Sequence, residues 1–266
     1  MQNVFDIASR CLQIADPDLK IQETDRAAQA WAAGELNIAS ETEPLAIGEP
    51  GRPSRPELVS TKQLRKRKAG SKEGHAALIH SITHIEFNAI NLAWDAVYRF
   101  RDMPEQYYAD WIKVAREEAY HFGLLRDHLR EDGYDYGDFP AHNGLWEMAQ
   151  QTAHDGMVRM ALVPRVLEAR GLDVTPGMIK RLKQQGDLRA VEILDIILRD
   201  EIGHVEIGTR WFRYYCEQRG LDSEKVFADL LSEYMHGAVR GPFHYAARQQ
   251  AGFTEAEMNM LEGNIK

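Results

Sequence analysis

Two hexapeptides decide how this sequence folds: REEAYH at residues 116–121 and RDEIGH at residues 199–204. Both have the order Arg, acid, Glu, two further residues and His. Residues three apart lie on one face of an α-helix, so each hexapeptide presents a carboxylate and an imidazole side by side. In each case the Glu and the His fall on the apolar stripe of a long predicted helix, which indicates that they face a core. The sequence therefore predicts two buried Glu-x-x-His pairs.

A single acid precedes each pair by almost the same distance. Glu86 lies 32 residues before Glu118, and Glu168 lies 33 residues before Glu201. Glu86 falls on an apolar stripe, and Glu168 shares a helix face with apolar residues. The chain is therefore predicted to contain two helical hairpins of matching length, each offering a Glu followed by a Glu-x-x-His pair.

The expected charge of these residues points to bound metal. Burying four carboxylates beside two imidazoles without positive charge would be very costly, whereas two divalent cations would neutralise them. Carboxylate and imidazole ligands without sulfur suit iron or manganese, while zinc takes fewer ligands and often binds thiolate. The structural alternative is that these acids form salt bridges with Arg116, Arg159 and Arg199.

The rest of the chain also favours helix. Helix-forming residues are abundant and alternating β-branched runs are nearly absent. Breaks are expected at 103–104, 133–140 and 171–177, and Pro164 is expected to kink the helix that contains it. The long predicted helices span residues 74–101, 104–132, 144–170 and 187–219, and the shorter ones span 4–14, 23–37 and 223–239, with a last one opening at 254–257.

We predict an all-α protein in three parts. Residues 1–72 hold two helices, then a segment at 40–57 with four prolines that cannot be helical, then a basic run from Lys62 to Lys72. Residues 73–219 form a four-helix bundle with helices long enough for that architecture. Residues 220–266 form a helical extension.

The composition and net charge limit the kinds of partner and the location that we expect for the protein. The 266 residues carry a net charge of −9, which argues against phosphate-backbone binding by the whole surface but leaves a local basic contact at 62–72 open. We expect no membrane span, because no apolar run is long enough, and no secretory signal, because residues 1–16 lack a basic region followed by an apolar core. The two cysteines suggest a reducing compartment, so a cytoplasmic location is expected.

The paired motif resembles the ferritin-like di-iron carboxylate superfamily over about residues 74–219. Within it, the chain is most similar to a bacterial ferritin-like family of undefined function, itself similar to tRNA-hydroxylating di-iron monooxygenases. The resemblance implies a ferritin-like four-helix bundle that holds two iron ions, with Glu118 and Glu201 bridging them. The six metal ligands it implies are Glu86, Glu118, His121, Glu168, Glu201 and His204.

Three neighbours of these ligands are also candidates. Asp200 and Glu117 could accept the second ring N–H of a ligand histidine, or pair with a basic residue on the helix surface. Tyr120 could carry a proton or a radical, or pack in the core. Two other motifs are interpreted as unrelated to the metals: the pair formed by Glu233 and His236 as a chance match, and His80 and His84 as surface or partner-facing residues.

The resemblance implies an oxidoreductase that activates O2 to hydroxylate or otherwise oxidise a substrate, either a small molecule or a tRNA-linked group. An external electron donor is expected, because the sequence has no rubredoxin-type cysteine cluster. The alternatives are a ferritin-like iron-handling or ferroxidase protein, a tRNA-modifying hydroxylase, and a manganese catalase-like enzyme. Manganese in place of iron stays open, as does a homodimer.

Overall fold

The computed structural model describes residues 2–39, 43–64, 70–235 and 239–263. Helices dominate these residues, and strand is limited to a two-residue parallel pair and one isolated bridge. The predicted all-α class is therefore confirmed. The chain divides into two compact units, Met1–Glu147 and Met148–Lys266, which are described in turn. The predicted division after residues 72 and 219 stays a prediction.

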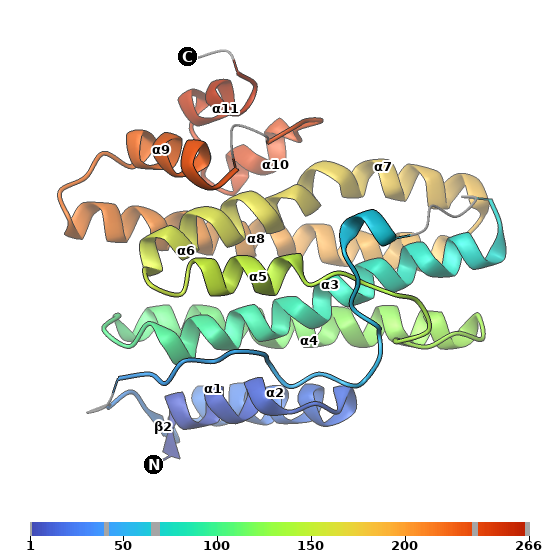
Figure 1. Ribbon diagram of the computed structural model, residues 1–266, viewed down its shortest axis with the longest axis horizontal. Helices are drawn as coiled ribbons and strands as arrows, with labels where there is room; N and C mark the ends of the chain where they lie inside the picture. Colours follow the sequence, from blue (N-terminus) through green and yellow to red (C-terminus); the bar gives the residue numbers. More distant parts are fainter. Residues whose placement is uncertain (1, 40–42, 65–69, 236–238, 264–266) are drawn as a thin grey trace. The chain divides into compact units, whose positions relative to one another are not determined.

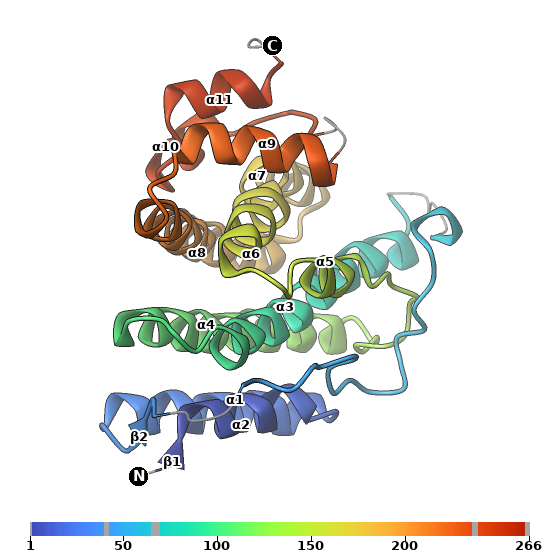
Figure 2. The ribbon, with the colours of Figure 1, turned by 60° about the vertical axis from the view of Figure 1, so that its left-hand side comes forward.

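A long helical hairpin forms the centre of the first unit. Its arms α3 (Lys72–Arg99) and α4 (Glu105–Glu131) pack along their length, and α1 (Val4–Gln13) lies against α3 while α2 (Pro17–Ala32) lies against α4 (Figures 1 and 2). Side-chain caps set where α1, α2 and α3 begin: Asn3, Asp16 and Ser71 each accept a hydrogen bond from a backbone N–H of the first turn. The elements of this unit are β1 (Gln2–Asn3), α1 (Val4–Gln13), α2 (Pro17–Ala32), β2 (Leu36–Asn37), η1 (Thr61–Gln63), α3 (Lys72–Arg99) and α4 (Glu105–Glu131), with α5 (Gly144–Gln151) crossing into the second unit.

Buried polar contacts hold α1 and α2 on the hairpin. The Lys20 ammonium donates to the Cys11 carbonyl at 2.9 Å and to Asn91 Oδ1 on α3 at 2.6 Å. The Trp94 indole donates to Thr24 Oγ1 at 3.0 Å. Each contact joins different helices in a dry core, so together they restrict how α3 can rotate. This matters because α3 carries Glu86, the first candidate ligand.

The proline-rich segment lacks helix at residues 43–57, as predicted. It lies tightly against the end of α1, where the Gly51 N–H donates to the Leu12 carbonyl at 2.7 Å. A Cβ at Gly51 would lie 2.2 Å from the Gln13 carbonyl oxygen, so only glycine fits this approach. Most of the predicted basic run, residues 65–69, falls outside the described residues.

The prediction that His80 and His84 face the surface is wrong. Both are buried, and each binds the loop that follows α4. The Gly137 N–H donates to His80 Nε2 at 2.9 Å, while His84 lies 2.9 Å from the Tyr136 hydroxyl. These rings provide polar partners for a loop that crosses the hairpin, a role that helix periodicity alone does not reveal.

In the second unit, α6 and α7 run alongside α8, and the short helices α9, α10 and α11 cover one side of them (Figures 1 and 2). Between α6 and α7 lies η2, a π-helical segment that contains Pro164. The elements are α6 (Gly156–Leu162), η2 (Val163–Glu168), α7 (Ala169–Gln185), α8 (Leu188–Gln218), α9 (Ser223–Met235), α10 (Tyr245–Gln250) and α11 (Glu255–Leu261).

The predicted helix at residues 144–170 needs correction. It is interrupted between α5 and α6, where Asp155 caps a new helix by accepting from the Met157 N–H at 2.8 Å. The predicted break at 171–177 is absent, since α7 continues through Pro176. Burial of Leu172 and Leu182 on either side of this proline offsets the one hydrogen bond it removes.

Candidate metal centre

The first unit brings Glu86, Glu118 and His121 together. Glu86 comes from α3 and the other two from α4, and their candidate ligand atoms lie within 4.8 Å of one another. Nδ1 of His121 lies 3.3 Å from Oε2 of Glu86 and 3.4 Å from Oε2 of Glu118. All three side chains are at least 97% buried. We call this group the hairpin triad.

The charges of the hairpin triad are strongly coupled. Burial and the neighbouring carboxylate of Glu118 raise the pKa of Glu86 well above its usual value. Burial alone would lower the pKa of His121, but the two carboxylates outweigh it and raise that pKa to about 11. Glu86 and His121 therefore retain protons that they would lose in water.

A divalent cation fits this donor set. It would supply the positive charge that the protons now supply, and the available ligand atoms are carboxylate oxygens and an imidazole nitrogen. Such ligands without thiolate suit iron or manganese. The hairpin triad is therefore chemically competent to hold one such ion through protein side chains from two helices.

The second unit repeats part of this arrangement. Glu201 and His204 lie on α8, both buried, with His204 Nδ1 3.8 Å from Glu201 Oε2. Glu168 is the last residue of η2 and is partly buried, and η2 packs against α8. Its direct participation with Glu201 and His204 stays a prediction. We call these three residues the second triad.

The sequence matches the family described as "Protein of unknown function (DUF455)" over residues 13–259, which is most of the chain. The chain belongs to the DUF455 family. An uncharacterized protein of Haemophilus influenzae is 53% identical over 216 residues, which cover 79% of this chain and 75% of that protein. No solved structure matches the chain.

In this DUF455 protein, the acids next to the ligand candidates contact basic residues of their own helices. Asp200 Oδ1 accepts from Arg199 Nε at 2.9 Å, and Glu117 lies 3.6 Å from Lys113 Nζ. The side chain of Tyr120 is exposed, with 55% of its surface accessible, so it does not pack in the core. A role for the three beside a metal stays a prediction. His236 of the proposed chance pair lies outside the described residues.

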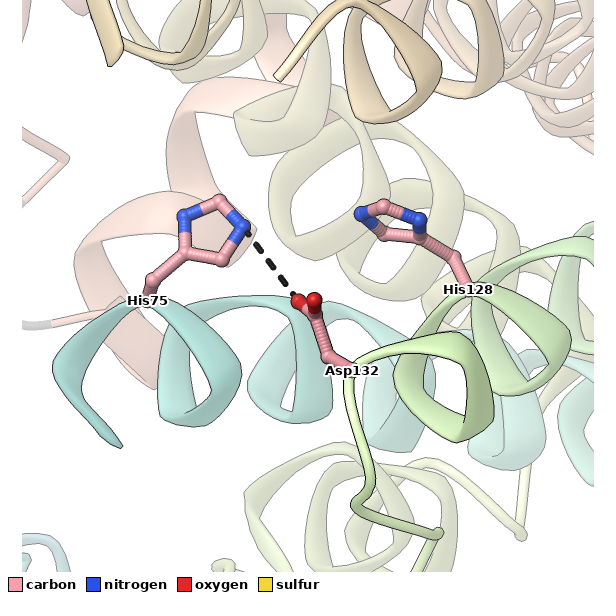
Figure 3. A group of neighbouring side chains, drawn as sticks. All are labelled: His75, His128 and Asp132. Carbon is pink, nitrogen blue, oxygen red and sulfur yellow. Dashed lines mark ion pairs between the residues drawn. The ribbon is translucent and has the colours of Figure 1, made fainter. Parts of the chain in front are cut away.

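A second cluster of ligand-type residues in this DUF455 protein escaped the sequence analysis. His75, near the start of α3, lies close to His128 and Asp132 at the end of α4 (Figure 3). The spacing of His128 and Asp132, four residues apart on one helix, was a signal that could have found two of them. Their partner His75 is distant in sequence, and only the hairpin brings it near.

No helix among the residues that the structure describes is both long and apolar enough to span a bilayer.

Proposed function

We propose that this protein is a ferritin-like di-iron oxidoreductase that uses O2 to hydroxylate or otherwise oxidise an organic substrate. The observation that carries the proposal is the hairpin triad, a buried group of two glutamates and a histidine in which the pKa values of Glu86 and His121 are raised. The second triad has the same residue types at nearly the same spacing in the sequence. Ferritin-like di-iron bundles use this set: two single glutamates and two Glu-x-x-His pairs.

Each triad would contribute three ligands to the proposed centre. When bound, a reduced di-iron pair supplies O2 activation and the oxidation of a neighbouring C–H bond. Manganese fits the same ligands, so the identity of the metal is part of the test.

The chain's own residues prepare the hairpin triad for this role. Glu86, Glu118 and His121 are buried, which excludes bulk water and strengthens their interaction with any cation placed between them. On losing their retained protons, Glu86 and His121 would become better ligands, so metal binding and proton release are expected to occur together.

The second triad lies next to a distorted helix. Glu168 ends the π-helical segment η2, and π-helical turns within α-helices occur frequently at functional sites because they redirect side chains. Here the distortion supports the proposal by giving a local reason for Glu168 to depart from regular α-helical direction.

Hydroxylation would place one oxygen atom of O2 in the substrate and release the other as water, consuming two electrons and two protons. Both cysteines are buried free thiols, so no cysteine-based electron relay is available among the described residues. An external electron donor is therefore part of the proposal. The substrate class is a small molecule or a tRNA-linked group.

Iron loading followed by oxygen uptake tests the proposal. We expect two irons per chain in the wild type and O2 consumption with a chemical reductant, both lost in Glu118→Gln and His204→Gln. Glu206→Gln is the matched control. Glu206 lies on the same helix as Glu201 and His204 but pairs with Arg210 on its solvent-exposed face. Undiminished iron in both ligand variants would overturn the proposal.

Two other outcomes would indicate a different function. Loading with manganese and O2 release from peroxide would indicate a catalase, and a large iron-filled assembly would indicate storage.

A further inference from the structure

The open end of the α3–α4 hairpin carries a second group of ligand-type side chains. Figure 3 shows His75 on one side and His128 on the other, their ring planes nearly perpendicular, with the carboxylate of Asp132 below and between them. His75 Nε2 lies 3.9 Å from Asp132 Oδ2, and the two ring centroids are 6.4 Å apart. One ligand atom from each residue lies within 4.8 Å of the others. We call this group the end cluster.

We propose that the end cluster binds one divalent transition-metal ion of the zinc type, separate from the metals of the proposed di-iron centre. Two imidazoles and one carboxylate form a standard three-ligand set for zinc, with a fourth position left for water. His128 comes seven residues after His121, which places it about 10 Å further along α4. No residue is shared with the hairpin triad.

The ligand atoms of the end cluster, which lie within 4.8 Å of one another, have to move closer to close around an ion. Metal–ligand bonds of 2.0–2.1 Å in a tetrahedral site place ligand atoms about 3.3 Å apart. The present 3.9 Å between His75 and Asp132 therefore has to shorten by roughly half an ångström. His75 lies in the first turn of α3, and Asp132 is the C-cap of α4. Both are at helix ends, where the backbone adjusts more easily than within a helix.

The exposure of the three side chains differs in a way that suits an accessible site. His128 is 8% exposed, His75 17% and Asp132 36%. The buried ring of His128 would anchor the ion, while the more exposed side gives it a path from solvent and room for a water ligand. The hairpin triad, by contrast, is almost fully buried.

A fourth residue supports the orientation of His128. Its Nδ1 lies 3.6 Å from Oε2 of Glu131, the next acid on α4. Ligand histidines commonly turn their second ring nitrogen toward a carboxylate, which favours the tautomer that binds metal through the other nitrogen. Nε2 of His128 is therefore the nitrogen proposed to bind the ion, and Nδ1 would form a hydrogen bond with Glu131 once this pair shortens from 3.6 Å.

A metal here would connect the first turn of α3 to the end of α4. It would thereby fix the end of the hairpin whose middle carries Glu86, Glu118 and His121. Metal binding by the end cluster therefore requires neither substrate nor O2.

Cobalt(II) binding to metal-free full-length protein tests the inference, because a four-coordinate cobalt site absorbs visible light far more strongly than a six-coordinate one. We expect the strong bands in the wild type and their loss in His75→Gln and Asp132→Asn, with the total bound metal falling by one ion per chain. His154→Gln is the matched control, since His154 is exposed and lies outside the cluster. Circular dichroism checks that each variant folds.

Two results would overturn the inference: strong cobalt bands that survive in both His75→Gln and Asp132→Asn, or a folded wild type that binds no more metal than these variants. The Glu118→Gln variant separates this inference from the proposed function. It should keep the cobalt bands of the end cluster even though it loses iron, so either idea can fail while the other stands.

Discussion

Pro164 of η2 lies directly against Gly208 of α8. A Cβ at position 208 would lie 2.3 Å from Cγ and 2.4 Å from Cβ of Pro164, closer than atoms can approach. Gly208 is one helical turn after His204, and Pro164 is one turn before Glu168. This contact therefore sets how closely the π-helical segment approaches the helix that carries Glu201 and His204.

Gly208→Ala should destabilise the protein by about 1–3 kcal/mol, because the added methyl group displaces the Pro164 ring. The matched control is Gly203→Ala on the same helix, where nothing lies within 4 Å of the added Cβ. There the gain in helix propensity should stabilise by up to about 1 kcal/mol. Urea unfolding of both variants measures the difference, and equal effects at the two positions would contradict the close contact.

Besides the contact between Pro164 and Gly208, a buried ion pair of Arg165 holds η2 in place. Its guanidinium is fully buried, donates to Glu257 Oε1 at 2.5 Å and lies 4.0 Å from the Phe227 ring centroid. Arg165→Met should cost about 3–5 kcal/mol, because it removes the nearest positive charge from the buried Glu257 carboxylate. Adding Glu257→Gln to Arg165→Met should recover part of the loss. A double-mutant cycle by chemical unfolding measures the coupling, and strictly additive effects would show that the pair is not coupled.

The Asp155–Arg219 pair should make stability depend on pH. Burial alone would raise the pKa of Asp155, but Arg219 at 2.6 Å and the Met157 N–H hold it below the usual 3.8. A carboxyl whose folded pKa is lowered stabilises the protein above its unfolded pKa, and this contribution is lost as the pH falls through the folded value.

Asp155→Asn isolates this charge, because asparagine still caps α6. The variant should be less stable than the wild type at pH 7 by no more than about 1 kcal/mol, since the pair is partly exposed. The difference should shrink as the pH falls below about 4. Urea midpoints of both proteins across this range measure it, and a difference that does not change with pH would contradict the assignment.

Helix type and the core face were predictable from the sequence, because apolar spacing determines which side of a helix is buried. Glu86, Glu118, His121, Glu201 and His204 were all placed on apolar stripes, and all five are buried. The closeness of Glu86 to His121 was also predictable, since a short connection makes α3 and α4 neighbours.

Helix ends were harder to predict. The sequence Asp16-Pro17 is a strong signal for the start of a helix and fits the observed beginning of α2. The predicted helix nevertheless began only at residue 23. In α7, Pro176 and two glycines suggested a break, but packing of the apolar face against α8 maintains the helix. Local propensity is a weak guide wherever tertiary burial is large.

Contacts that depend on the course of a loop, or on how the ends of two helices align, could not be predicted from one sequence. His80 and His84 are buried because a loop more than 50 residues later covers them, and His75 meets His128 only through the hairpin. A histidine has the same local sequence signature whether it is a loop partner, a ligand or a surface residue. Only its three-dimensional neighbours distinguish these roles.

The central claim is that the hairpin triad and the second triad hold their two irons as one coupled centre. Mössbauer and electron paramagnetic resonance spectra of the oxidised, iron-loaded full-length protein test it most directly. The account predicts two ferric ions per chain that are antiferromagnetically coupled, with a diamagnetic ground state and almost no resonance signal. Strong signals from magnetically isolated ferric ions, accounting for all the bound iron, would contradict it.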